Sequence, residues 1–341
     1  MNTAMLDDVS LIALLVAMGL YAAAFIAFAL DLARRSALVA DAATAAARQP
    51  SAVGATAARR GGTATLEREP ASSGRDGVAS GPDAPVAAGR SLSLNVAMVL
   101  LVVGFVAHAV ATVLRGLAAS RVPWANMYEF AMTGTLLILS VYLIVLTRRD
   151  LRFLGTFVTG LILILLGVAV VQYRVEVAPL PPSLQSYWLV IHVFVAALGT
   201  GFFALAFALS GVQLLQFRRE SLAADAQAAK MRFLATLPDS VTLESMAYRL
   251  NIVGFIFWTF TLMAGAIWAE RAWGRYWGWD TKEVWTFIIW VLYAGYIHAR
   301  ATRGWRGSRS AWLAIIGFSA VMFNFGVVNV FFKGLHTYSG L

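Results

Sequence analysis

Long runs of apolar residues, separated by short polar segments, recur along this chain of 341 residues. A helix that crosses a bilayer needs roughly 20 predominantly apolar residues, and in lipid its backbone polar groups must bond within the helix. The pattern therefore predicts an all-α integral membrane protein with about eight transmembrane helices. We place these helices at residues 9–30, 94–114, 127–146, 153–172, 187–217, 250–269, 284–300 and 310–332.

The segment between the first two predicted helices has a different composition. Residues 35–92 are rich in Ala, Gly, Ser, Pro and Arg and contain few aromatic or large aliphatic side chains. Such a segment buries too little apolar surface to offset the entropy of ordering. We therefore predict three parts: a first transmembrane helix within residues 1–31, a disordered cytoplasmic loop over residues 32–93, and a seven-helix domain over residues 94–341.

Composition and charge agree with a membrane location. The chain is 60% hydrophobic and 13% charged, with a mean hydropathy of +0.71, which is too apolar for a soluble globular protein. The net charge of +9 does not indicate nucleic acid, because 20 of the 27 Lys and Arg lie in alternate connections. Basic residues favour the cytoplasmic side of a membrane. We therefore expect a multi-pass protein of the cytoplasmic membrane with both termini on the outer, periplasmic side.

The outer segment 268–285 is unusually rich in tryptophan, with five in eighteen residues. One interpretation is an aromatic belt, because Trp favours the membrane interface. However, a belt needs only one or two rings at each helix end. The density here, interleaved with glycine, instead favours a flat apolar shelf for a planar ligand, with Trp273, Trp277 and Trp279 as its candidate contacts.

Charged residues of the same segment allow structural and binding roles. Asp280, followed three residues later by Glu283, is typical of a capping box that opens the seventh helix, and Asp280 is also a candidate contact of the bound ligand. Arg275 and Lys282 are candidates to meet ligand carboxylates, although lipid headgroups also explain basic residues at an interface.

The chain contains only four histidines. Helix lengths place His192 and His336 at the outer face, on either side of the tryptophan-rich segment, and His298 near the inner end of the seventh helix. A lone histidine in a membrane helix is more often a packing residue than a ligand. Ionisable residues in such helices are nevertheless rare and tend to be functional, and two neutral imidazoles can hold a haem iron. For His108 we expect packing.

Several motifs resemble one known family, the haem-handling membrane proteins of System II cytochrome c biogenesis, called CcsA or ResC. The similarity covers most of residues 95–341, and the tryptophan-rich segment resembles the WWD signature of several haem handlers. The motif residues are 123–129 (PWANMYE), 184–189 (LQSYWL) leading to His192, 273–285 with the helix to His298, and 334–336 (GLH).

The resemblance implies that the chain moves haem across the membrane and presents it to apocytochrome c for covalent attachment. It implies non-covalent b-type haem as transported substrate, with His298 as an intramembrane iron ligand and His192 and His336 as an external ligand pair. It also implies a membrane partner with a large external domain, of the CcsB or ResB type. The chain departs from the motif at Thr281, where proline is usual. Proline suits the first helical position, so helix initiation should be slightly weaker.

Two other functions remain open: a haem-delivery protein of the System I pathway, which shares the WWD segment, and a quinone-linked haem electron carrier. The external position of two histidines argues against the carrier. The chain has no cysteine, so it has no thiol of its own for exchange chemistry. The site residues include no obvious catalytic acid, base or nucleophile. A role as the haem-binding subunit of a cytochrome c haem lyase would then consist largely of positioning.

Overall fold

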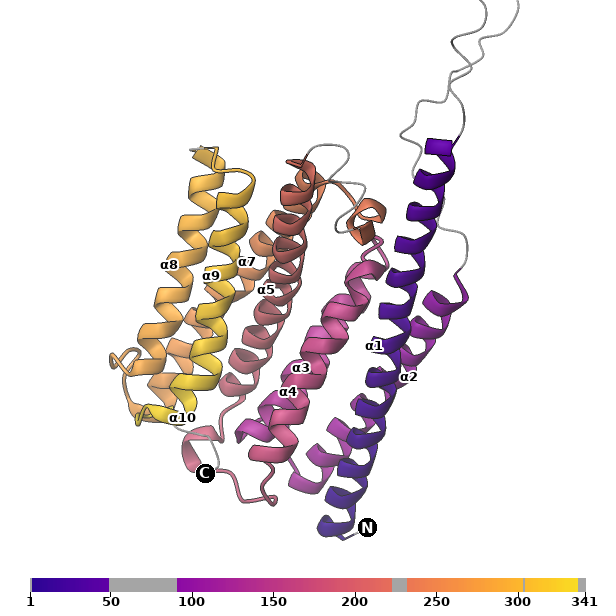
Figure 1. Ribbon diagram of the computed structural model, residues 1–341. Helices are drawn as coiled ribbons and strands as arrows, with labels where there is room; N and C mark the ends of the chain where they lie inside the picture. The colour runs from indigo at the N-terminus through magenta and orange to yellow at the C-terminus, as the bar shows by residue number, and fades with distance from the viewer. Residues whose placement is uncertain (1, 49–90, 223–231, 303, 337–341) are drawn as a thin grey trace, which may run out of the picture.

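The computed structural model describes residues 2–48, 91–222, 232–302 and 304–336, and eight long helices make up most of these residues (Figure 1). Short helical turns, η1 to η3, lie in the connections, and the last helix continues through a π-helix, η4, into the short helix α10. The long helices are α1 (Thr3–Arg48), α2 (Leu92–Ala119), α3 (Met127–Leu146), α4 (Gly155–Gln172), α5 (Tyr187–Glu220), α7 (Ser240–Trp273), α8 (Thr281–Thr302) and α9 (Ser308–Phe323). The short elements are η1 (Arg152–Leu154), η2 (Pro182–Leu184), η3 (Arg232–Thr236), η4 (Asn324–Val328) and α10 (Asn329–Phe331).

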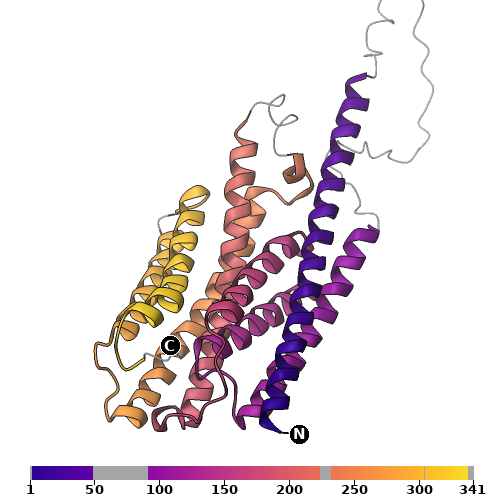
Figure 2. The same cartoon turned by 60° about the horizontal axis from the view of Figure 1, so that its bottom comes forward.

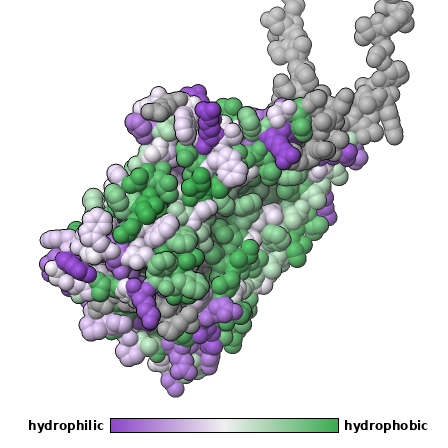
Figure 3. Space-filling model, turned by 60° about the vertical axis from the view of Figure 1, so that its left-hand side comes forward, coloured by the Kyte–Doolittle hydropathy of each residue, from purple (hydrophilic) through white to green (hydrophobic). Residues whose placement is uncertain are grey.

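The eight long helices alternate in direction, so that both ends of the chain and the α7–α8 connection lie at the same end of the bundle (Figure 1). Seven of them are long and apolar enough to cross a membrane. The eighth, α8, has 22 residues and runs beside α9, but it is more polar. A broad hydrophobic band covers the middle of the surface, with hydrophilic residues at its two ends (Figure 3). The predicted all-α membrane architecture is confirmed.

Helix α1 is longer than the sequence pattern predicted. It has 46 residues, which correspond to roughly 70 Å, and it extends well beyond its neighbour α2 (Figure 2). The predicted disordered loop over residues 32–93 therefore starts too early, because residues 32–48 are helical. Alanine, the strongest helix former, recurs through this part of α1 and explains the extension. The remainder of that loop, residues 49–90, lies outside the described residues.

Polar residues at the helix starts explain where several helices begin. Asn126 precedes α3, and its side-chain oxygen accepts the Glu129 backbone N–H at 2.9 Å. Asp239 caps α7 in the same way, accepting from the Thr242 N–H at 2.8 Å. Each cap satisfies an N–H that has no partner within its helix. At the other end of α7, Gly274 adopts a left-handed conformation (φ 70°) and ends the helix. Residues 274–280 then form the tryptophan-rich loop, which carries Trp277 and Trp279.

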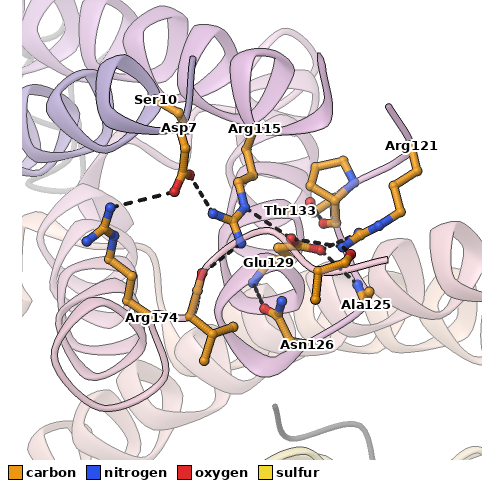
Figure 4. Close-up of polar contacts among 12 residues, drawn as sticks. Asp7, Ser10, Arg115, Arg121, Ala125, Asn126, Glu129, Thr133 and Arg174 are labelled. Atoms are coloured by element: carbon orange, nitrogen blue, oxygen red, sulfur yellow. Dashed lines mark hydrogen bonds and ion pairs between the residues drawn. The ribbon is translucent and has the colours of Figure 1, made fainter. Parts of the chain in front are cut away.

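A buried cluster of charges joins α1, α2 and α3 with the connections that follow α2 and α4 (Figure 4). Arg115 of α2 is fully buried; its Nε donates to Glu129 of α3 at 3.0 Å, and its Nη1 donates to Asp7 of α1. Arg121 also donates to Glu129, at 2.6 Å, and Arg174, after α4, lies 3.7 Å from Asp7. Because charges this deep are costly unless they are paired, the cluster ties α1 and α2 to the start of α3.

Candidate functional site

A cavity opens among α3, α5, α7, α8 and α9 near the tryptophan-rich loop. The empty space in and in front of this cavity amounts to about 1230 Å³, which includes open solvent. Most of its lining is apolar or small, and its few polar groups include His192, His336 and Lys282. The structure therefore brings two of the three predicted iron ligands to one cavity, although they lie 144 positions apart in the sequence.

His192 lies on α5 and is held by α7. Its Nδ1 is 3.0 Å from the carbonyl oxygen of Thr261, and its ring stacks on Trp268 at 5.9 Å between centroids. Gly265 lies one turn after Thr261, and a Cβ there would come within 2.7 Å of His192 Cε1. The imidazole thus occupies space that a missing side chain leaves free. With Nδ1 bound to the carbonyl, Nε2 is the nitrogen available for other partners.

His336 is also held through its Nδ1 atom, in this case by a side chain at the start of α8. Its Nδ1 lies 2.7 Å from Oδ2 of Asp280, whose Oδ1 accepts the Leu335 N–H at 3.3 Å. The hydrogen bond from His336 holds the pKa of the Asp280 carboxyl below its ordinary value, while burial opposes this shift. Gly334 permits the contact, because a Cβ there would lie 2.0 Å from Asp280 Oδ1. For His336 too, Nε2 remains available.

The tryptophans do not form one flat shelf. Trp273 packs edge-to-face on Trp268 and on His336, with centroids 4.7 and 4.9 Å apart. Trp277 lines the cavity, but Trp279 meets it at an interplanar angle of 89° and is 76% exposed. Trp273 therefore packs on His336, Trp277 faces the cavity and Trp279 lies at the surface. The predicted flat arrangement is wrong, because the loop turns sharply at Trp279, whose φ is 58°.

The start of α8 forms part of the predicted capping box. Glu283 reaches back to the Asp280 N–H at 3.1 Å and also accepts the Gly278 N–H at 2.8 Å. The carboxylate of Asp280 bonds His336, and it also interacts with the backbone N–H of Lys282 at the start of α8. Thr281 is the first residue of α8, the position where the motif usually has proline.

The remaining histidines lie away from this cavity. His298 is near the opposite end of α8, with an exposed side chain. His108 is fully buried: Nδ1 lies 3.2 Å from the Tyr21 hydroxyl and Nε2 lies 3.0 Å from the Met132 carbonyl oxygen. Since both of its nitrogens are engaged, the expected packing role of His108 is confirmed.

The sequence reasoning missed the residues that support the two histidines. Trp268, only 1% exposed, contacts both His192 and His336, whose centroid lies 5.4 Å from it. Thr261 and Gly265 complete the support of His192 from α7. Their spacing carried a usable signal, because Thr261, Gly265 and Trp268 fall on one helical face at intervals of four and three residues.

The part of the chain that carries this site is similar to a known protein family. Residues 124–336 match the family described as Cytochrome C assembly protein. The Cytochrome c biogenesis protein CcsA of Guillardia theta is 36% identical over 245 residues, covering 67% of this chain and 80% of that protein. The CcsA protein of Chlorella vulgaris is 34% identical over 257 residues, covering 67% of this chain and 81% of that protein.

A solved structure has a similar fold. The chain aligns over its whole length with the Cytochrome c Heme Lyase CcmF, at 15% identity and a TM-score of 0.59, and spans half of that longer protein. This likeness concerns the fold alone. The motif resemblance is confirmed by the sequence relatives: the chain belongs to the cytochrome c assembly protein family and, within it, to the CcsA proteins of cytochrome c biogenesis.

Proposed function

We propose that this chain binds haem in the outer cavity, with His192 and His336 as the two axial ligands of its iron. The observation that carries the proposal is the matched support of these imidazoles. Each offers Nδ1 to a fixed oxygen, on Thr261 or Asp280, and leaves Nε2 for a metal. Histidine ligands of metals are commonly oriented in this way by an outer partner.

The rest of the cavity suits a flat and mostly apolar ligand. Its lining is mostly apolar, it is partly open to solvent, and Trp277 offers an aromatic contact. The chain has no cysteine for a thioether bond, so the haem would be of the b type and held non-covalently, as a transported substrate.

We assign His298 to an earlier haem position in the membrane. It lies 17 residues beyond Thr281 along α8, or roughly 26 Å, which is close to the thickness of the hydrocarbon core. Because its side chain is exposed, a second ligand for an iron at His298 would come from another protein. This supports a membrane partner of the CcsB or ResB type, with a large external domain.

Delivery would then take place at the outer face of the cytoplasmic membrane. The end of the bundle that holds both termini would face the periplasm, since exposed basic residues such as Arg148 and Arg149 lie at the other end. Apocytochrome c would meet haem beside the tryptophan-rich loop. As the haem-binding subunit of a System II synthetase, the chain would contribute positioning, with cysteine thiols coming from the apocytochrome.

Absorption spectra of the purified full-length chain, with and without its partner, test the ligand assignment. Replacing His192 or His336 by Ala should remove one axial ligand from the outer haem, and added imidazole should restore the six-coordinate spectrum. Replacing His298 should instead lower the total haem that reaches the outer site, because an earlier position is lost.

His108→Gln is the matched control, because His108 is a histidine with a packing role, and its haem spectrum should match that of the unaltered chain. Normal haem spectra in all three alanine variants would show that the ligand assignments are wrong. Co-purification with an external-domain partner separates this proposal from a System I delivery protein. Reversible electron exchange with quinone would favour the carrier instead.

A further inference from the structure

The position of Lys282 at the start of α8 is unfavourable for a positive charge. It is the second residue of α8, where the positive end of the helix dipole disfavours a basic side chain. It also lines the same cavity as His192 and His336. A lysine at such a position raises the question of which negative charge offsets its cost.

The contacts of Lys282 with the protein are to neutral oxygens. Its Nζ donates to the carbonyl oxygen of Asn324 at 3.2 Å and to the side-chain oxygen of Asn329. The Asn324 carbonyl lies at the start of the π-helix η4, where the usual helical hydrogen-bond pattern is interrupted. An ammonium group has three donors, so these two contacts leave one donor for another partner.

The neighbouring carboxylates make their direct hydrogen bonds with other groups, although the charge of Asp280 is near enough to act on Lys282. Glu283 accepts two backbone N–H groups, and Asp280 binds His336 and the Leu335 N–H. Within the described ranges, Lys282 forms no ion pair with an Asp or Glu side chain. A partly buried ammonium without a direct counter-ion is costly, and a carboxylate from a bound ligand would remove that cost.

We propose that Lys282 binds a carboxylate of the ligand in this cavity, which for haem is a propionate group. The assignment rests on the proposed function and extends it, since it orients the porphyrin with a propionate edge toward η4. Arg275, the other basic candidate of the loop, is exposed, and its guanidinium lies over Gly278. The position of Lys282 in the cavity lining favours a cavity ligand over a lipid headgroup as its partner.

The test compares haem with haem dimethyl ester, in which both propionates are blocked. Binding to the full-length chain in nanodiscs of neutral lipid is measured by absorption titration, with empty nanodiscs as background. The unaltered chain should bind haem about 10- to 100-fold more tightly than the ester, the range expected for a charge-assisted hydrogen bond. Lys282→Met, which keeps the length but not the charge, should reduce this ratio to near one by weakening haem binding alone.

Two further variants sharpen the result. Lys282→Arg should retain the preference for haem, and Arg271→Met, at an exposed arginine near the same end of the bundle, should leave both affinities unchanged. Equal binding of haem and ester by the unaltered chain would overturn the assignment while leaving the outer haem site intact. An equal loss of both ligands in Lys282→Met would also overturn it. If the unaltered chain bound neither compound, the proposed function itself would fail.

Discussion

The position of His192 depends on the absence of a side chain at Gly265. A methyl group there would approach His192 Cε1 to 2.7 Å and Nδ1 to 2.9 Å, which the rigid imidazole can avoid only by leaving the Thr261 carbonyl. We expect Gly265→Ala to reduce haem retention about 10- to 100-fold, the usual effect of losing an outer partner of a metal-bound histidine. Haem content per purified protein measures this.

Gly167 provides the matched control for that substitution. It lies within α4, and no neighbouring atom lies within 4 Å of the position of an added Cβ. Gly167→Ala should therefore leave both haem content and protein level unchanged. Full haem content in Gly265→Ala would mean that His192 tolerates displacement and does not act as an iron ligand from its observed position.

At the residue scale, the sequence predicted the location of the candidate groups better than their arrangement. His192, His336 and Trp277 line the same cavity, as motif spacing and helix length led us to expect. The contact between Asp280 and His336 was not predictable, because 56 residues separate the two and a local capping role explained Asp280 equally well. Local patterns reveal hydrogen bonds within a helical turn, but they do not reveal contacts made by tertiary folding.

Among the elements, α8 shows where composition misleads. Its 22 residues match a bilayer span in length, yet it is not among the seven helices that are apolar enough by composition. Polar residues at its two ends, Lys282 and Glu283 at one and His298 and Arg300 at the other, lower its hydropathy. The apolar run between those ends was still sufficient to predict the helix. The length of α1, in contrast, depends on alanine propensity and was underestimated from the apolar pattern alone.

The charge cluster that joins α1, α2 and α3 leads to a stability prediction. Replacing fully buried Arg115 by Met leaves Asp7 and Glu129 without one of their counter-charges. Removing one partner of a buried pair typically costs about 3–5 kcal/mol, so thermal unfolding in detergent should occur at a clearly lower temperature.

An exposed ion pair supplies the control for this prediction. Arg152 and Asp150 are 2.6 Å apart, but their side chains are 39% and 61% exposed. Such pairs contribute about 0–1 kcal/mol, so Arg152→Met should change the unfolding midpoint little. Equal behaviour of the two variants would show that the buried cluster does not stabilise the bundle.

At the scale of the whole molecule, the orientation of the chain in the membrane can be tested. Because the chain lacks cysteine, single introduced cysteines can be labelled without background. We expect Glu176→Cys and Arg271→Cys to react with a membrane-impermeant maleimide in intact cells. Arg149→Cys and Arg306→Cys, at the opposite end, should react only after the membrane is permeabilised. All four positions are exposed in the folded chain, so failure to label does not reflect burial. The reverse pattern would invert the topology.

The two outer histidines differ in how stiffly the backbone holds them. His192 is part of α5, a helix of 34 residues packed inside the bundle, and moving it requires shifting that helix or breaking its bond to Thr261. His336 follows α10 in a non-helical segment after Gly334, and its side chain contacts Asp280, Trp268 and Trp273. One histidine is therefore fixed by a helix backbone, and the other by contacts of its side chain. A planar ligand bound between them, as proposed above, would therefore meet less backbone resistance on the His336 side than on the His192 side.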